Sequence, residues 1–485
     1  MHYLLSIGPS LRDAYLASLA TAHPPLLIIL LHYWGKISAS EFFLRLPSVI
    51  AGTAAGWFLY AWLLAVAGRE TALVALALFL FSPALIYSSA EVRQYALLLL
   101  FMSVALWCLD RAFAIGRARW MLLSAAALYL ALLTHYCALI FAASLGGYGL
   151  LRILSRRPAA PWTGVWMTTQ LGAGSIAGFL WKTHISLIRH RPLTQDVAQS
   201  YLRSSLFHAG QENVLSFLAR SHLRLFHFLF SQGAVSVLGL VLFAAGIVLL
   251  LGEKNAETGP RGPAPRQFGI LLLSPFLINL AAALAAIYPY GGTRHNAYLA
   301  IFAFAAMAVA ITRLHFRWKW AKALAMATLL AISNLTVVPA GAYIRPKNQK
   351  KEWMEKAVAY LKASAPPGSV LLTDYESGLL LSYYLCGTDI THAGEPVDWF
   401  YQSRCGEYES VSLLPRLWVF RIDTFPEQMR ELAPALPPGR EVWLFQAGFI
   451  VDREPEFQAL LADYGCASPE KFGANILVCR IHGKG

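Results

Sequence analysis

The chain has 485 residues, of which 57% are hydrophobic and only 14% are charged, and its formal net charge is +13. This composition is too apolar for an ordinary soluble protein of this length. The positive charge does not indicate nucleic-acid binding, because much of the Lys and Arg lies in short loops between apolar runs, as in multi-span membrane proteins. We therefore expect a cell-membrane protein that binds no nucleic acid.

Residues 1–45 are expected to form an extracytoplasmic loop and a helix lying in the membrane interface. The apolar run at 24–35 is too short to span the bilayer core, which needs about 20 residues per helix. The segment Met1–Ala22 has no basic region followed by an apolar run, so it does not resemble a cleavable secretion signal. The distribution of basic residues places the N-terminus outside the cytoplasm, and the lack of a cleavable signal then predicts that a transmembrane helix precedes Met1.

Residues 46–343 are expected to form a transmembrane domain of about ten spans. The expected spans are 46–67, 71–88, 95–112, 118–134, 136–154, 162–182, 233–252, 268–288, 296–312 and 321–343. Basic residues, among them Arg69, Arg152 and Arg313, accumulate in alternate loops, which predicts that those loops are cytoplasmic. The long loop 183–232 then lies outside, and its basic and aromatic residues predict amphipathic helices on the membrane surface.

Residues 344–485 are expected to form a small soluble α/β domain on the extracytoplasmic side. Helices are expected at 350–363 and 376–385, and strands at Ser369–Thr373 and near 416–421, 441–446 and 475–481. This alternation is typical of an α/β layer domain. Asp374 follows the first strand, where open α/β sheets bind ligands, but an Asp before a helix is also an ordinary cap, and we favour the cap.

Four of the six cysteines lie in this C-terminal domain, which the expected topology puts in an oxidising compartment where disulfides form. These are Cys386, Cys405, Cys466 and Cys479. Four cysteines allow three pairings, and the short separations favour Cys386–Cys405 and Cys466–Cys479. Cys108 and Cys137 fall in expected spans and are interpreted as core residues.

Five groups of polar residues fall at the extracytoplasmic ends of the expected spans. They are His23-Pro24-Pro25, Glu41 to Ser48 with Arg45, Glu91 to Tyr95 with Arg93, His135-Tyr136, and Tyr288 to His295 with Arg294. Each has an ordinary explanation: arginines reach lipid headgroups, a histidine caps a helix, and Gly291-Gly292 makes a tight turn. Their convergence on one face nevertheless favours a functional site.

The order and spacing of these motifs resemble glycosyltransferase family 39, whose members are multi-span GT-C enzymes related to protein O-mannosyltransferases and to the lipid A aminoarabinose transferase. The motifs are His-Pro-Pro-Leu, Glu-Phe-Phe-Leu-Arg-Leu-Pro-Ser, Glu-x-Arg-x-Tyr, Thr-His-Tyr and the run Tyr-Pro-Tyr-Gly-Gly-Thr-Arg-His. The resemblance extends over nearly the whole chain. It implies a polytopic α-helical membrane protein of GT-C-like fold with a small C-terminal extracytoplasmic α/β domain.

The resemblance also implies a reaction, the inverting transfer of a sugar from a polyprenyl-phosphate donor to an extracytoplasmic lipid, glycan or protein. The phosphate that leaves carries negative charge, which arginines stabilise through charge-assisted hydrogen bonds. We expect the donor phosphate to contact Arg93, Arg294, His295 and Arg45. Supporting or acceptor contacts are expected from His23, Glu41, Glu91, Tyr95, His135 and Tyr136. Some relatives hold a divalent metal near the equivalent loop, but no ligand set is defined here, so the metal stays open.

The family's general base is an Asp, usually followed by Glu, after the first transmembrane helix. The chain lacks that pair, and its alignment with the family places the pair immediately upstream of Met1. Asp13 is a possible surrogate, but the preferred interpretation is a solvated charge on an amphipathic segment. Two alternatives remain: a flippase for lipid-linked sugars, which would carry charges in the middle of its spans, and a catalytically incompetent membrane scaffold.

Overall fold

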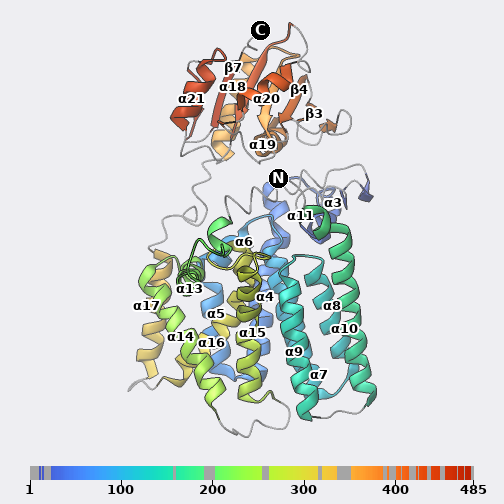
Figure 1. Ribbon diagram of the computed structural model, residues 1–485, viewed down its shortest axis with the longest axis vertical. Coiled ribbons are helices and arrows are strands. Elements are labelled where there is room, and N and C mark those ends of the chain that lie inside the picture. The colour runs from blue at the N-terminus through green and yellow to red at the C-terminus, as the bar shows by residue number, and fades with distance from the viewer. Residues whose placement is uncertain are drawn as a thin grey trace. The chain divides into compact units, whose positions relative to one another are not determined.

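The computed structural model describes residues 10–12, 14–15, 23–156, 160–189, 202–253, 262–314, 319–335, 351–385, 390–392, 400–405, 407–413, 422–423, 425–433, 439–447, 454–466, 468–473 and 476–481. They divide into a helical unit, which runs to residue 335, and an α/β unit, which begins at residue 351 (Figure 1).

The helical unit consists of helices joined mostly by short turns. They are α3 (Leu26–Trp34), α4 (Glu41–Val66), α5 (Arg69–Leu80), α6 (Pro83–Ala90), α7 (Tyr95–Ile115), α8 (Ala118–Leu132), α9 (Ala138–Arg156), α10 (Ala160–Leu180), the π-helix η1 (Trp181–Ile185), α11 (Ser186–Arg189), the 3-10 helix η2 (Arg203–Ser205), α13 (Val214–Phe230), α14 (Gly233–Gly252), α15 (Pro265–Leu284), the 3-10 helix η3 (Arg294–Leu299), α16 (Ala300–Arg313) and α17 (Lys319–Leu335). In Figure 1 the long helices run side by side.

A helix or a helix pair lies in each of the ten expected spans. Within the described residues, six helices are long and apolar enough to cross a membrane, or seven if the pair α5 and α6 is one span. That pair is a correction to the single helix expected at 71–88, because it bends by 62°. The bend falls at Ser82-Pro83, where proline supplies no N–H to continue the helical ladder. The chain is therefore a multi-pass membrane protein.

Successive helices run in alternating directions, so their connections gather at two ends of the bundle. One end carries Glu91, His135 and His295 and is called the site end below. The other, the basic end, is held by ion pairs between α17 and α5 and between α16 and the end of α14. Lys322 lies 2.8 Å from Glu70, and Arg313 lies 2.8 Å from Glu253.

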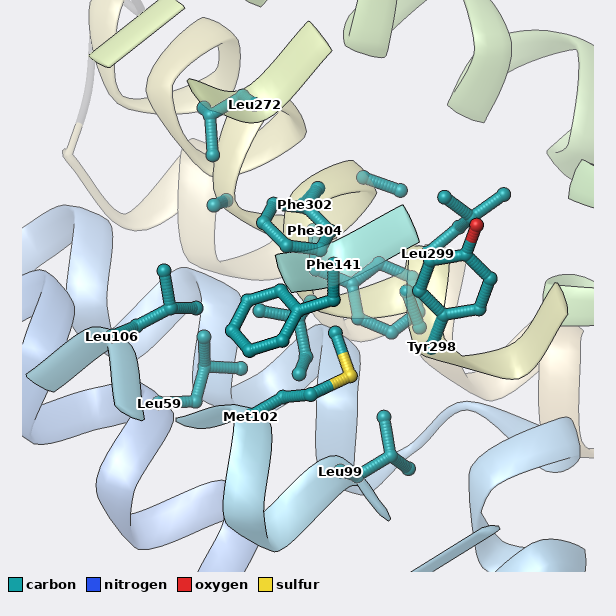
Figure 2. Close-up of a cluster of buried hydrophobic side chains, with 14 of the residues drawn as sticks. Leu59, Leu99, Met102, Leu106, Phe141, Leu272, Tyr298, Leu299, Phe302 and Phe304 are labelled. Carbon is teal, nitrogen blue, oxygen red and sulfur yellow. The ribbon is translucent and has the colours of Figure 1, made fainter. Parts of the chain in front are cut away.

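Helix α16 is the centre of the bundle. Of the span that contains it, 89% is buried, compared with 39% for α4 and for α14. Figure 2 shows Phe302 and Phe304 of α16 among side chains of α4, α7 and α9, including Leu59, Met102 and Phe141. Small residues permit helix α14 to pack closely against α16. A Cβ on Gly246 of α14 would lie 2.0 Å from the carbonyl oxygen of Ala306 in α16.

A buried ion pair near the basic end corrects one expectation, because Arg152 is not a loop residue. It lies on α9 with a side chain that is 1% exposed, 2.5 Å from Asp110 of α7. The carboxylate of Asp110 also accepts hydrogen bonds from Trp62 Nε1 at 2.8 Å and from the Tyr148 hydroxyl at 2.6 Å. The network joins α4, α7 and α9, and its hydrogen bonds offset the cost of burying two charges in a membrane bundle.

The α/β unit is built on a seven-stranded sheet with the order β2-β3-β4-β1-β5-β7-β6. Strands β4, β1 and β5 are parallel, and the remaining pairs are antiparallel. The elements are α18 (Lys351–Ser364), β1 (Val370–Asp374), α19 (Tyr375–Leu385), β2 (Ile390–His392), β3 (Phe400–Cys405), β4 (Tyr408–Leu413), α20 (Phe425–Leu432), β5 (Val442–Gln446), α21 (Glu454–Ala462), β6 (Glu470–Phe472) and β7 (Ile476–Ile481). Helices α18 and α19 cover one face of the sheet, and α20 and α21 cover the other. The strand expected near 416–421 lies outside the described residues.

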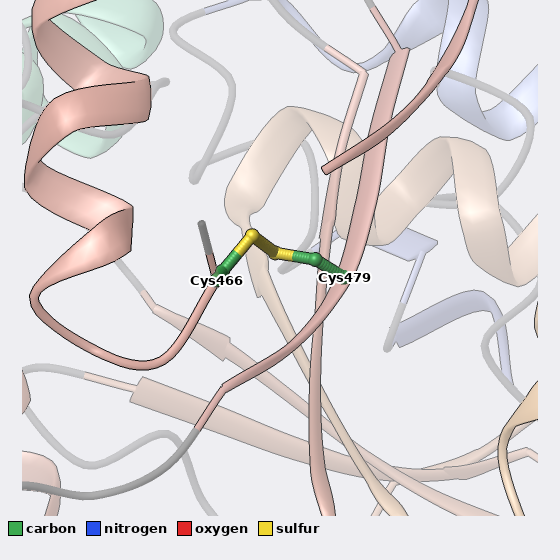
Figure 3. Close-up of a disulfide and its surroundings, with 2 residues drawn as sticks. All are labelled: Cys466 and Cys479. Atoms are coloured by element: carbon green, nitrogen blue, oxygen red, sulfur yellow. A yellow bond between two sulfur atoms is a disulfide. The ribbon is translucent and has the colours of Figure 1, made fainter. Parts of the chain in front are cut away.

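Two expectations for this unit concern single residues. Asp374 caps α19, since its Oδ1 accepts a hydrogen bond from the backbone N–H of Ser377 at 2.7 Å. Figure 3 shows the disulfide that joins Cys466, after α21, to Cys479 on β7, the pairing that the short separation favoured. Cys386 and the side chain of Cys405 lie outside the described residues, so their pairing stays a prediction. In the helical unit, Cys108 and Cys137 are buried free thiols.

Candidate active site

Three histidines and a tyrosine meet at the site end. The His135 ring lies 6.2 Å from the His23 ring, 5.8 Å from the His295 ring and 5.4 Å from the Tyr95 ring, centroid to centroid. Tyr95 also contacts His295 edge-on at 6.4 Å. These four residues, called the histidine cluster, come from four separate segments of the chain, and the fold brings them together.

Short turns and caps hold this cluster. The backbone N–H of Leu26 donates to the carbonyl of Leu133 at 3.0 Å, which pins the start of α3 to the turn that follows α8. Within that turn the N–H of Cys137 donates to His135 Nδ1 at 3.2 Å. In the neutral imidazole an accepting Nδ1 leaves the proton on Nε2. His135 therefore presents an N–H donor to the cluster.

His135 is neutral at physiological pH. Its side chain is 2% exposed, and burial lowers its pKa to about 4. The charged imidazolium would lose its hydration without an acidic partner to replace it.

A charged cluster, consisting of Tyr87, Glu91, Arg93 and Arg294, adjoins the histidines. Arg93 Nε lies 3.3 Å from Glu91 Oε2, and both side chains are mostly buried. The Tyr87 hydroxyl donates to the other oxygen of Glu91. The charges of Arg93 and Arg294 both act on Tyr87 and on His295. Among the described residues, two guanidinium groups thus share one neighbourhood with the carboxylate of Glu91.

The loop that carries Arg294 and His295 is fixed by its own hydrogen bonds. Asn296 accepts from Asn279 of α15 at 2.5 Å and donates to the carbonyl of Gly291 at 3.1 Å. The Tyr288 hydroxyl donates to the carbonyl of His295 at 3.2 Å.

Each of the two glycines in this loop has a structural reason. Gly292 packs against α13, and Gly291 has a backbone conformation that other residues rarely adopt. A Cβ on Gly292 would lie 2.4 Å from the carbonyl oxygen of Arg224 in α13, and Gly291 has φ +137°. The tight-turn interpretation is therefore correct as well, because this turn sets the position of Arg294.

The remaining sequence candidates lie further out or elsewhere. Arg45 is half exposed, 3.5 Å from Glu41, and donates to the carbonyl of Ala90 at 3.4 Å, at the rim of the charged cluster. The Tyr136 hydroxyl is buried. Asp13 lies outside the described residues. Among the residues that are described, no group of three His, Cys, Asp or Glu side chains is arranged to hold a metal ion.

No role was predicted for Tyr87, Gln94 or Tyr288, although Gln94 and Tyr288 stand inside two of the sequence motifs. Gln94 is 1% exposed, and its Nε2 lies 3.3 Å from His23 Nδ1. Its place inside the Glu91–Tyr95 motif was the available signal. Tyr87 sits among apolar residues, where a tyrosine is ordinarily a core residue.

A protein-family model matches the part of the chain that contains most of these site residues. A family model described as dolichyl-phosphate-mannose-protein mannosyltransferase matches residues 22–171. The match includes Glu91, Arg93 and His135 but ends before Arg294 and His295. A search of curated proteins finds no match.

Solved structures share the fold. The chain is similar to ArnT from Cupriavidus metallidurans bound to undecaprenyl phosphate, with a TM-score of 0.52 and 12% identity over 99% of this chain and 92% of that one. It is also similar to ArnT in the apo state, with a TM-score of 0.49, 12% identity and the same coverage. For the archaeal oligosaccharyltransferase AglB from Archaeoglobus fulgidus the TM-score is 0.41, with 11% identity over 76% of this chain and 56% of that one.

The similarity to ArnT with undecaprenyl phosphate, which has the TM-score of 0.52, is the one that supports the fold assignment. At 12% identity it shows architecture alone. The GT-C-like membrane fold with a small C-terminal α/β domain, expected from the motifs, is thereby confirmed.

Proposed function

We propose that the chain is a membrane glycosyltransferase that transfers a sugar from a polyprenyl-phosphate donor to a hydroxyl group of an acceptor. The observation that carries this proposal is the meeting of the charged cluster and the histidine cluster at one end of a GT-C-like bundle. Titratable groups at the ends of membrane helices mark functional sites. Among the described residues of the two clusters, Arg93, Arg294 and His135 supply N–H donors against the one carboxylate of Glu91, which suits a phosphate.

Bond breaking explains why such donors are needed. As the acceptor oxygen attacks the anomeric carbon, the bond from that carbon to the phosphate oxygen breaks and its electron pair leaves with the polyprenyl phosphate. The proton of the acceptor hydroxyl is balanced by the released phosphate, which can take it up. Arg93 and Arg294 would stabilise the growing negative charge through charge-assisted hydrogen bonds. The N–H of His135 adds a neutral donor whose strength does not depend on protonation near neutral pH.

Glu91 is assigned to orient Arg93. Its carboxylate is held by the Tyr87 hydroxyl and by Arg93 Nε. Both contacts fix the carboxylate beside Arg93, where it can direct the guanidinium. A guanidinium carries five N–H groups, and this contact uses one nitrogen of Arg93.

The donor class rests on the comparisons. ArnT was crystallised with undecaprenyl phosphate, and the matching family is described by dolichyl-phosphate-mannose. A long-chain polyprenyl phosphate is the chemistry common to both. We propose a hexose or pentose as the sugar, and a lipid, glycan or protein as the acceptor.

The site end is proposed to face away from the cytoplasm, together with the C-terminal α/β unit. The basic end carries Arg69, Arg117 and Arg119, and positive residues remain on the cytoplasmic side of membranes. The disulfide Cys466–Cys479 supports an oxidising compartment for the α/β unit.

The flippase alternative is not favoured. It would require charged residues in the middle of the spans that serve a moving ligand. The buried pair Asp110–Arg152 is not assigned that role, because Trp62 and Tyr148 both donate to Asp110 and fix the carboxylate near the basic end.

The test is binding of undecaprenyl phosphate to the full chain in nanodiscs. Arg294→Gln should weaken the Kd at least tenfold, because one charge-assisted contact contributes about 1.5–3 kcal/mol. Arg119→Gln at the basic end is the matched control, since it removes an exposed arginine and should leave the Kd unchanged. Equal Kd values for wild type and Arg294→Gln would remove Arg294 from the donor site.

A further inference from the structure

Helix α10 ends in an irregular turn at the site end. Helix α9 leaves that end at Ala138 and α10 returns to it, where the α-helix passes into the π-helix η1. A π turn inserts a residue into the helical ladder, and such turns are frequent at functional sites. Here the turn carries His184, whose side chain is fully buried. Its ring contacts the rings of Tyr15 at 5.6 Å and Phe179 at 5.9 Å.

The hydrogen bonds of Thr183 fix the tautomer of His184. The Thr183 hydroxyl donates its single proton to the carbonyl of Phe179 at 2.7 Å. The same oxygen lies 2.8 Å from His184 Nδ1. It can only accept from that nitrogen, so Nδ1 carries the proton and Nε2 carries the lone pair.

That lone pair is buried without a partner. Within the described part of the chain, His184 Nε2 and the Tyr136 hydroxyl make no hydrogen bond. Tyr15 lies beside both, since it contacts the His184 ring and interacts electrostatically with Tyr136. A buried polar group without a hydrogen-bond partner is destabilising. A histidine that served only to fill the core would have its lone pair satisfied. Two unsatisfied polar groups beside Tyr15 therefore indicate that a ligand supplies the missing hydrogen bonds.

Their chemistry indicates the class of ligand. His184 offers a hydrogen-bond acceptor, Tyr136 offers a hydroxyl, and the rings of Tyr15 and Phe179 offer apolar faces. The contacts of this group include no guanidinium or ammonium group within the described residues. A neutral hydroxyl satisfies the lone pair, whereas a phosphate or carboxylate oxygen would face another electron pair.

We propose that Tyr15, Tyr136 and His184 form the acceptor subsite, in which His184 Nε2 accepts a hydrogen bond from a sugar or polyol hydroxyl of the acceptor. This proposal rests on the proposed function, because the subsite lies at the site end, where Tyr136 directly follows His135 of the donor site. It assigns the acceptor to uncharged hydroxyl compounds. His184 binds and positions the acceptor here, and no proton transfer is assigned to it.

The experiment observes His184 itself. The full chain, labelled with ¹⁵N-histidine in nanodiscs, gives imidazole resonances that distinguish the two tautomers, and the His184→Gln spectrum assigns the signal. The wild type should show His184 with a protonated Nδ1 and an unprotonated Nε2. The methyl glycosides of mannose, glucose and galactose are then added as probes, and glycerol phosphate is added as the anionic comparison.

At least one methyl glycoside should shift the Nε2 resonance at millimolar concentration, and glycerol phosphate should not. Thr183→Val should lose the fixed tautomer and weaken the response, while His227→Gln, which replaces an exposed histidine of α13, should change neither. A protonated Nε2, no response to any glycoside, or a response to glycerol phosphate alone would each overturn the proposal. Undecaprenyl phosphate binding is measured on the same samples. If the wild-type chain does not bind this lipid, the proposed function is refuted, whatever the result for His184.

Discussion

His135 shows how a single side chain is set by its surroundings. The turn after α8 uses its Nδ1 as a backbone cap, and the cluster of rings removes water from the rest of the imidazole. An ordinary cap would have left the ring in solvent. Here His135 closes a turn and also presents an N–H group to the proposed phosphate site. The two interpretations of His135 from the sequence, a helix cap and a site residue, are therefore compatible.

The burial of His135 predicts a dependence of stability on pH. Its pKa of about 4 in the folded chain lies below the ordinary value of 6.5. The unfolded chain therefore binds the proton more readily between these values, so the stability contributed by neutral His135 is complete above pH 6.5 and is lost as the pH falls towards 4. The Tm of the full chain in detergent should fall over that window, and the fall should be smaller for His135→Asn.

Asparagine keeps an acceptor for the N–H of Cys137 but does not titrate. The matched control is His227→Asn, whose exposed side chain has no burial to lose, and its Tm profile should follow that of the wild type. Parallel profiles for His135→Asn and wild type would show that another group controls the acid transition.

The buried ion pair predicts an asymmetric mutational result. Asp110→Leu should destabilise the chain by about 3–5 kcal/mol, because it leaves the Arg152 guanidinium buried without its anion. The double variant Asp110→Leu/Arg152→Met should recover part of that loss, since both charges are then absent. Thermal or denaturant unfolding in micelles measures both. Glu41→Gln, which breaks the exposed pair with Arg45, should cost less than about 1 kcal/mol.

A double variant that is as unstable as Asp110→Leu alone would contradict this account. The ion pair also marks a limit of sequence analysis at the scale of residues. Arg152 was assigned to a cytoplasmic loop by its neighbours in the sequence, and Asp110 is too distant along the chain for local composition to pair the two. In contrast, local sequence was enough to predict the site residues that stand at the end of an apolar run, namely Glu91, Arg93, Arg294 and His295.

At the scale of elements, hydrophobic length located the helices well and their irregularities poorly. All ten expected spans contain helix, because 20 apolar residues have few other structures in a bilayer. The bend between α5 and α6 and the π turn after α10 were not anticipated. Both depend on how a few backbone groups are satisfied by neighbouring helices. The pairing of β3 with β4 was missed as well, since these strands lack an apolar alternation.

The contact between α13 and the loop 288–295 predicts a long-range effect on binding. Gly292→Ala places a methyl group where the Arg224 carbonyl lies, so the loop must move away from α13. Because this loop carries Arg294, undecaprenyl phosphate binding should weaken at least tenfold, as for Arg294→Gln. Equilibrium binding in nanodiscs measures the change.

Gly233→Ala is the control for this prediction, because a Cβ at Gly233 meets nothing within 4 Å. Binding that is unaffected by Gly292→Ala would mean that the loop adapts without displacing Arg294. In that event α13 would not be a support for the donor site.

At the scale of the whole molecule, the sequence predicted the composition of each end of the bundle, and the structure supplied the meeting of distant segments at one of them. Motif order placed His23, Arg93, His135 and His295 on one side of the membrane. Only the packing of the helices shows that the histidines share a cluster, while Arg45 remains at the rim. Side-chain convergence depends on helix rotation, which no loop charge specifies.

The orientation of the bundle gives a prediction for the intact protein in cells. Cysteine introduced at exposed Gln211, in the connection between η2 and α13, should react with a membrane-impermeant maleimide added from outside. Cysteine introduced at Arg117, at the basic end, should react only after the membrane is made permeable. Labelling of the wild type gives the background from native thiols. The reverse pattern would invert the topology and place the proposed reaction in the cytoplasm.

The central position of α16 has a consequence for how the protein is made. The helix packs against α5, α14 and α15, which are synthesised before it, and it follows directly on Arg294 and His295. A nascent chain leaving the ribosome therefore carries Arg93 and His135 in the bilayer long before their partners are translated. The proposed donor site is completed only when Arg294 and His295 have inserted, so a prematurely terminated product would hold Arg93 and His135 without them and should bind undecaprenyl phosphate weakly.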